Sequence, residues 1–199
     1  MGTCGYNMIK EFNPGDIILT GGKAWISRAI RWITRHRGED ITIKNHAGIG
    51  INNQYYVEAL WTTKRHTYDH LFKLNTQYEI WRNNTFNDKD LEMVKIKAIE
   101  YVGMIYAPQK IALHLLDGLA GKLLGRDVFK FRRLAMFDRY PICSWVVAFA
   151  YNEIGYSFGI DPRFASPDCL HDHLVDNNDW KIVNTNHDKY YTQTKLLQD

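Results

Sequence analysis

Short apolar runs bounded by turn-forming residues predict the strands of this chain. Such runs lie at residues 17–19, 46–51, 55–60, 78–81 and 180–183. The segment Asn52-Asn53-Gln54 alone separates the second run from the third, and this short polar connection predicts a hairpin.

Helical spacing and capping residues predict the helices. Apolar residues at helical spacing indicate a helix over 24–34. Capping and first-turn residues predict further helices at about 87–102, 109–116 and 142–154, and from 166 onward. Together the elements predict an α+β domain, in which a mostly antiparallel sheet or half-barrel packs against helices.

The predicted elements span residues 13–183, which we interpret as one domain. A chain of 199 residues suits one domain, here with an N-terminal extension at 1–12 and a polar tail at 184–199. The stretch 111–140 is long and contains several glycines, which suggests a lid or an entrance loop.

Composition and charge exclude several classes of protein. The net charge of +3 is too small to indicate nucleic-acid binding. The basic cluster at 28–37 reads as the solvated face of a helix, with a phosphate-binding surface as the alternative. The chain has neither an apolar run that could span a membrane nor an N-terminal apolar segment typical of a secretory signal. We therefore expect a cytoplasmic protein, and nothing in the pattern indicates its oligomeric state.

Cysteine usage points to one candidate nucleophile. Three cysteines, Cys4, Cys143 and Cys169, suit neither a disulfide framework nor a Cys-rich zinc site. Cys143 falls at about the third position of the helix that Pro141 begins, where free backbone N–H groups and the helix dipole favour a thiolate. The competing interpretation is a small buried hydrophobe, the usual role of a free cysteine.

The register of the predicted hairpin brings a histidine and a carboxylate together. With a three-residue loop, Ile49 faces Val57 on an apolar face that belongs in the core. His46 and Glu58 then share the other face as diagonal neighbours on adjacent strands, with roughly 7–8 Å between their backbones. Gly48, opposite Glu58, leaves the carboxylate room to turn toward the imidazole. The alternative is that Glu58 only solvates a surface strand.

The remaining histidines do not predict a metal site. His171 and His173 are two residues apart on the predicted last helix, so their rings point in different directions. His66 and His70 could share a helical face with Asp69 nearby, but a third ligand is missing and a solvated loop is the simpler interpretation. We expect no metal and no cofactor.

The segments that carry this chemistry follow a distinctive order. They read GDIIL (15–19), NHAGIGI (45–51), VEAL (57–60) and PICSWVV (141–147). This order resembles the circularly permuted branch of the NlpC-type, papain-like amidases, typified by YiiX-like proteins, and the resemblance covers about residues 13–183. It implies a permuted papain-like domain with Cys143 as nucleophile, His46 as base and Glu58 as the orienting acid.

Two further residues bear on the resemblance. Trp145 stands where relatives often carry an acidic residue, which puts the substrate specificity in doubt. The resemblance also suggests Tyr106 as a donor to the oxyanion, beside the backbone N–H of Cys143. A ring packed beside Pro108 is the competing interpretation of Tyr106.

These features predict a cysteine hydrolase that cleaves an amide bond through an acyl-enzyme, in a peptide such as a peptidoglycan stem or in an acylated amine. A second hypothesis is a lipid-directed thioesterase or acyltransferase, which the Trp-rich segment 25–33 favours. A third is a catalytically idle module that holds a peptide or lipid in the same fold. The intact set of Cys143, His46 and Glu58 argues against the third.

Overall fold

The computed structural model describes residues 12–21, 44–60, 62–74, 76–105 and 142–186, together with Leu116 and Ala120. Outside these residues lie most of the N-terminal extension and of the tail, the predicted helix at 24–34, and the stretches 109–116 and 111–140 except for Leu116 and Ala120.

In the described part of the chain, six strands form one antiparallel sheet. They are β1 (Ile17–Gly21), β2 (His46–Gly50), β3 (Tyr55–Ala59), β4 (Thr63–Thr67), β5 (Gln77–Asn83) and β6 (Trp180–Thr185). Their order across the sheet is β4-β3-β2-β1-β5-β6, and each neighbouring pair is antiparallel. β1 therefore lies between β2 and β5.

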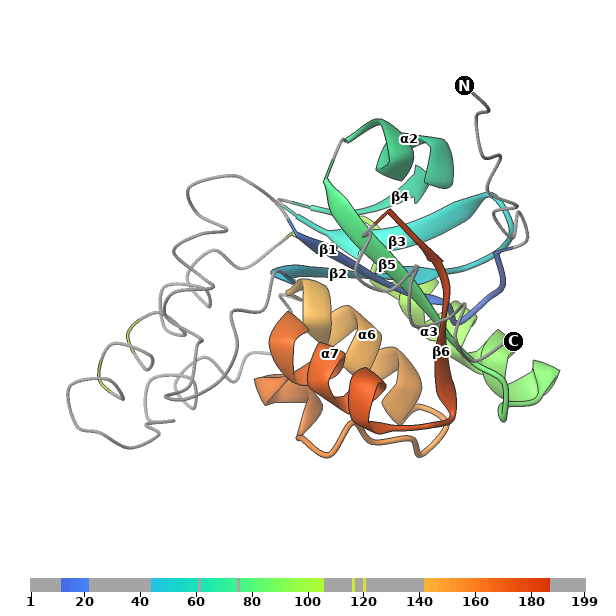
Figure 1. The fold of residues 1–199 in the computed structure, drawn as a ribbon, viewed down its shortest axis with the longest axis vertical. Coiled ribbons are helices and arrows are strands. Elements are labelled where there is room, and N and C mark those ends of the chain that lie inside the picture. The colour runs from blue at the N-terminus through green and yellow to red at the C-terminus, as the bar shows by residue number, and fades with distance from the viewer. Residues whose placement is uncertain are drawn as a thin grey trace, which may run out of the picture.

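Helices pack on both faces of the sheet. They are α2 (Tyr68–Lys73), α3 (Asp88–Glu100), α6 (Cys143–Asn152), α7 (Pro167–Asp176) and the short 3-10 helix η1 (Pro162–Phe164). Figure 1 shows α6 and α7 on one side of the sheet and α2 on the other. The predicted α+β class is confirmed. Among the described residues, no helix has the length and apolarity that crossing a bilayer would require.

The main core lies between the sheet and α6. The buried residues of α6 are Cys143, Ser144, Trp145, Val146, Val147, Ala148, Ala150 and Tyr151. Most of them pack with the inner face of the sheet, which includes Ile17, Leu19, Ile49 and Val57. A helix that is apolar on nearly every side is stable in water only when it is buried on every side, and α6 has this position.

The opposite face of the sheet carries a second apolar cluster. It consists of Phe12, Ile18, Tyr56, Tyr68, Leu71, Tyr78 and Ile80. Because side chains alternate across a strand, Ile17 and Leu19 enter the main core while Ile18 enters the second cluster. Burial on both faces explains the uninterrupted apolar run of β1.

The predicted strands and the caps of α3 and α7 are confirmed, whereas the predicted start of the Cys143 helix at Pro141 is wrong, because Ile142 is the cap and Cys143 the first helical residue. The side chain of Asn87 accepts a hydrogen bond from the backbone N–H of Asp90 at 3.0 Å, at the start of α3. The side chain of Ser166 accepts one from the N–H of Cys169 at 3.1 Å, at the start of α7. Each cap satisfies a backbone donor that the first helical turn leaves without an intrahelical partner.

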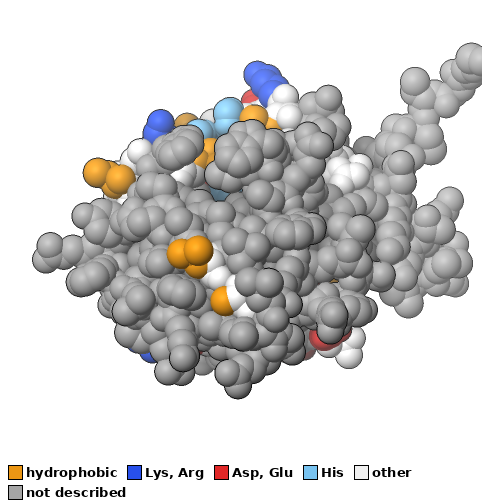
Figure 2. All heavy atoms as spheres, turned by 90° about the vertical axis from the view of Figure 1, so that its left-hand side faces the viewer, with side chains coloured by type: hydrophobic (Ala, Val, Ile, Leu, Met, Phe, Trp, Pro, Cys, Tyr) orange, Lys and Arg blue, Asp and Glu red, His pale blue; other side chains and the backbone are white. Residues whose placement is uncertain are grey.

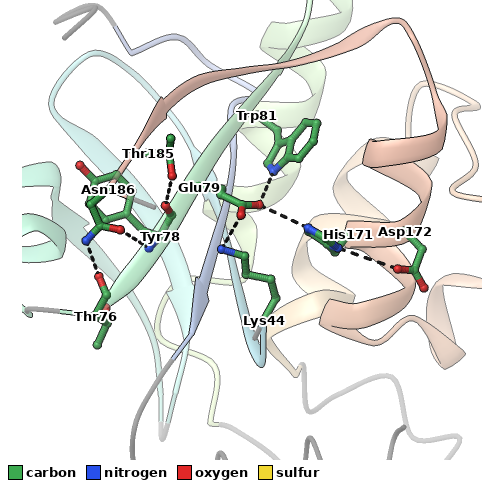
Figure 3. Close-up of polar contacts among 9 residues, drawn as sticks. All are labelled: Lys44, Thr76, Tyr78, Glu79, Trp81, His171, Asp172, Thr185 and Asn186. Carbon is green, nitrogen blue, oxygen red and sulfur yellow. Dashed lines mark hydrogen bonds and ion pairs between the residues drawn. The ribbon is translucent and has the colours of Figure 1, made fainter. Parts of the chain in front are cut away.

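The predicted start of the polar tail at residue 184 is wrong, because β6 continues to Thr185. The Thr185 hydroxyl donates to the Tyr78 carbonyl at 2.8 Å, and the Asn186 side chain accepts from the Tyr78 N–H at 2.8 Å, as Figure 3 shows. Asn184 is buried and accepts a hydrogen bond from the Tyr78 hydroxyl. The polar residues 184 and 185 give no apolar strand pattern, yet they extend β6 because their side chains form hydrogen bonds with Tyr78 of β5.

The sequence pattern does not predict β4 or α2. β4 reads TKRHT and is largely exposed, which suits an edge strand whose charges prevent further pairing. α2 is short, and it begins where the Thr67 hydroxyl accepts a hydrogen bond from the backbone N–H of His70 at 3.3 Å. Short charged elements carry little hydrophobic periodicity, so the pattern leaves no signal for them.

Candidate active site

The hairpin has the predicted register. Gly48 lies opposite Glu58 and Ile49 opposite Val57. His46 Nε2 lies 2.7 Å from Glu58 Oε2. Glu58 is only 4% exposed, so the alternative in which it solvates a surface strand is wrong.

Gly48 lies close to two neighbours on β3, Tyr56 and Val57. A Cβ atom at this position would lie 3.1 Å from the Tyr56 ring and 3.1 Å from the Val57 carbonyl oxygen. The absence of a side chain at Gly48 therefore leaves room for the Tyr56 ring. The ring in turn carries a hydroxyl that reaches Glu58.

Cys143 is the first residue of α6. The cap residue, Ile142, is extended and provides no side-chain hydrogen bond to the helix. The Cys143 sulfur instead accepts hydrogen bonds from the backbone N–H groups of Ser144 and of Ala47, which is the residue after His46 in β2. The buried Ser144 hydroxyl donates to the Ala165 carbonyl at 2.7 Å and fixes this first turn. The start of α6 is thus held against the start of β2.

Cys143 and His46 lie in contact and shift each other's pKa. Burial raises the pKa of the Cys143 thiol, but the charge and hydrogen bond of His46 lower it further than burial raises it. Burial also lowers the pKa of His46, yet the thiolate and then Glu58 outweigh this effect and raise it to about 10. Because Nε2 of the ring faces Glu58, Nδ1 is the nitrogen that remains for Cys143. The two groups thus favour each other's charged form, a thiolate beside an imidazolium.

Glu58 has further partners besides His46. The Tyr56 hydroxyl donates to Oε1 at 3.3 Å, and His66 Nε2 lies 3.6 Å from the same oxygen. Burial raises the pKa of Glu58, but the hydrogen bond and charge of His46, with smaller contributions from His66 and Tyr56, hold it below its usual range. Glu58 therefore stays ionised behind the imidazole.

Comparison with known proteins identifies the fold. No protein-family profile and no curated protein matches this chain. A solved structure does match: the metalloprotein YiiX from Escherichia coli O157:H7, with a TM-score of 0.61 and 17% sequence identity. The match covers 87% of this chain and 97% of that chain. The fold is YiiX-like. At this level of identity the likeness shows the fold alone.

A buried charge cluster braces the YiiX-like fold close to His46. Lys44 Nζ lies 2.7 Å from Glu79 Oε1, and both side chains are almost fully buried. The indole N–H of Trp81 donates to Glu79 Oε2 at 3.1 Å, and His171 Nε2 lies 3.4 Å from the same oxygen (Figure 3). The cluster joins the segment before β2 to β5 and α7. Lys44 is two residues from His46, so the cluster fixes the strand that carries the imidazole.

The sequence gives no direct signal for this cluster. Glu79 lies between apolar neighbours in β5, so alternation places it on one face of the sheet without naming a partner. Lys44 and His171 come from distant segments, and only the tertiary fold brings the three together. The one usable signal was a glutamate inside an apolar strand, because a buried carboxylate requires a partner.

The structure separates His171 from His173, as their spacing predicts. His171 faces Glu79, whereas His173 Nε2 lies 2.8 Å from the Tyr156 hydroxyl. The interpretation of His66 and His70 as parts of a solvated loop is wrong, since His66 lies in β4 and His70 in α2. The pairing of β3 with β4 places His66 opposite Tyr56 and therefore on the same face as Glu58. A correct prediction of β4 would thus have placed His66 beside Glu58.

Other candidates from the sequence lie elsewhere. Tyr106, the suggested oxyanion donor, is outside the described residues. Trp145 is 4% exposed, and its ring packs edge-on against Phe149. Cys169 accepts a hydrogen bond from the Ser166 hydroxyl at the start of α7. Of the three cysteines, Cys143 is the one that contacts a histidine among the described residues.

Proposed function

We propose that this protein is a cysteine hydrolase of amide bonds with a permuted papain-like site, in which Cys143 is the nucleophile, His46 the base and Glu58 the orienting acid. One observation carries the proposal: Cys143 at the first position of a helix contacts His46, whose Nε2 lies 2.7 Å from the buried Glu58 carboxylate. Nucleophile, base and orienting acid in one hydrogen-bonded chain are the parts of a catalytic triad.

The reaction follows from these contacts. The Cys143 thiolate attacks the carbonyl carbon, a C–S bond forms, and the carbonyl oxygen becomes an oxyanion near the backbone N–H groups that begin α6. The His46 imidazolium donates its proton to the departing amine as the C–N bond breaks, which leaves an acyl-enzyme. His46 then takes a proton from the attacking water, and the C–S bond breaks to release the acid and the thiolate. Glu58 stays ionised and holds the imidazole in orientation.

The pH dependence of Cys143 alkylation tests the proposal. Cys4→Ser and Cys169→Ala leave Cys143 as the single cysteine. Because its pKa is lowered, we expect iodoacetamide to react rapidly well below the ordinary thiol pKa of about 8.5, with a decline only as acid protonates the thiolate. His46→Ala removes the counter-charge and should slow labelling at pH 7 by about tenfold or more, equivalent to a shift of one pKa unit. Labelling that tracks an ordinary thiol in the single-cysteine protein would overturn the proposal.

A substrate comparison separates amide from lipid hydrolysis. Peptide and N-acyl amide panels, and a panel of acyl thioesters, are offered to the wild type and to Cys143→Ala. We expect amide turnover that the Cys143→Ala variant lacks. Turnover of thioesters alone would favour the lipid-directed enzyme, and turnover of neither panel, with a reactive Cys143, would favour a module that only binds such molecules.

A further inference from the structure

A second group of ligating side chains lies directly behind the triad. Glu58, His66 and His70 each offer one ligand atom, and these atoms lie within 4.8 Å of one another. Glu58 Oε1 and His66 Nε2 are 3.6 Å apart, too far for a good hydrogen bond. Two ligands of one tetrahedral zinc ion stand roughly 3.4 Å apart, given metal–ligand bonds of about 2.1 Å. The distance between Glu58 Oε1 and His66 Nε2 is therefore close to that between two ligands of one zinc ion.

The backbone brings His70 to this pair. The chain turns from β4 into α2 between the two histidines, and the Thr67 cap holds that turn. The rings of His66 and His70 stack with their centroids 4.5 Å apart. Tyr68 and Leu71 anchor α2 in the second apolar cluster, so the helix has a fixed position. The two imidazoles are thus carried by packed elements.

The site is open to solvent on its histidine side. The His66 side chain is 21% exposed, whereas that of Glu58 is 5% exposed. Figure 2 shows histidine side chains at the surface of one face of the molecule. An ion could therefore reach the imidazoles from solution and find the carboxylate at the inner end. Two histidines and one carboxylate, with a fourth position left to water, suit zinc.

We propose that Glu58, His66 and His70 bind a divalent transition-metal ion of the zinc type. The bound ion would lower the reactivity of Cys143 by acting on His46 through Glu58. The carboxylate would bind the ion with Oε1 while Oε2 keeps its 2.7 Å contact with His46 Nε2. An ion on Oε1 draws negative charge away from the carboxylate and weakens its hold on the imidazolium. The effect of the ion on Cys143 reactivity rests on the proposed function, whereas the binding of the ion does not.

Calorimetric titration of metal-free protein with Zn²⁺ tests the site. The Cys143→Ala variant is used, because a thiolate beside His46 could itself bind zinc. We expect one equivalent to bind. His70→Ala or His66→Ala in the same background should weaken binding by at least the roughly 10-fold to 100-fold that loss of an outer-shell partner causes, because each variant removes a direct ligand. His173→Gln, which alters a histidine outside the cluster, should bind like the parent. If the His70→Ala and His66→Ala variants, shown to be folded by circular dichroism, bind as tightly as the parent, the site is overturned.

Alkylation of Cys143 in the single-cysteine protein tests the link to the triad. Saturating Zn²⁺ should slow labelling several-fold, and this effect of zinc should disappear in His70→Ala, each variant being compared with its own metal-free rate. Slowing that persists in His70→Ala would place the ion on Cys143 and His46, and would overturn the link through Glu58. Ordinary thiol reactivity in metal-free protein would refute the proposed function, while the calorimetric result would still decide the metal site.

Discussion

Glu58 offers its two carboxylate oxygens to different partners. Oε2 contacts His46, and Oε1 faces the Tyr56 hydroxyl and His66. A buried carboxylate is tolerated only when charged or hydrogen-bonding groups compensate for lost water, and these three groups do so. The charge of Glu58 therefore acts on His46 on one side and on Tyr56 and His66 on the other.

Replacing Glu58 by Gln should slow the thiol chemistry without changing the shape of the site. The amide can still contact His46 but carries no charge, so the imidazolium and its thiolate partner lose stabilisation. We expect labelling of Cys143 at pH 7 to fall about tenfold, equivalent to roughly 1.4 kcal/mol. The measurement is the iodoacetamide rate in the single-cysteine protein.

Tyr56→Phe is the matched control for Glu58→Gln. It removes one hydrogen bond to the same carboxylate and keeps the ring that packs against Gly48. The charge remains, so labelling should change less than about threefold. Equal slowing in both variants would mean that hydrogen bonding around the carboxylate, and not its charge, sustains the reactive thiol.

At the residue scale the sequence predicts the His46–Glu58 pair because alternation and loop length fix a hairpin register. The pairing of Ile49 with Val57 is enough to put both polar residues on one face. Cys143 is different, since its distance from His46 depends on how α6 packs on β2. No periodicity encodes that packing, and only the resemblance to a family linked the two segments.

At the scale of elements, the start of β2 is held from several directions. Cys143 at the start of α6 accepts a hydrogen bond from the backbone of Ala47, and the Lys44–Glu79 pair ties the preceding segment to β5. Capped helices and apolar strands were predictable because their signals are local. β4 was not predictable, because its exposed Lys64 and Arg65 interrupt the apolar alternation that would place His66 on a strand.

Breaking the Lys44–Glu79 pair should destabilise the fold strongly. Lys44→Met leaves a carboxylate in the interior without its ammonium partner, which typically costs roughly 3–5 kcal/mol. The double variant Lys44→Met with Glu79→Leu removes both charges and should recover much of that loss. The free energy of unfolding in urea, measured for both single variants and the double variant, gives the interaction energy. Additive losses would show that the two side chains contribute independently.

At the scale of the whole molecule, the sheet order makes the site a product of long-range contacts. β1 pairs with β2 on one side and with β5 on the other, so strands distant in sequence become neighbours. Apart from the β2–β3 hairpin, local patterns indicate the strands but not which of them pair, and this is why the α+β class was predictable and the full strand order was not. In this topology α6 packs on β2 and β3, which brings Cys143 into contact with His46.

The reactivity of Cys143 should therefore disappear together with the tertiary structure. In the single-cysteine protein at pH 6, below the ordinary thiol pKa of about 8.5, we expect rapid labelling in the native state and slow labelling once the chain unfolds. Because His46 and Glu58 reach Cys143 only through the packed sheet, the loss should follow the same urea midpoint as the Trp fluorescence change. His46→Ala supplies the comparison, since it lacks the counter-charge and should show a much smaller change in rate at its own midpoint. Rapid labelling that outlasts the fluorescence transition would mean that the residues near Cys143 in sequence activate the thiol, and that the assembled site does not.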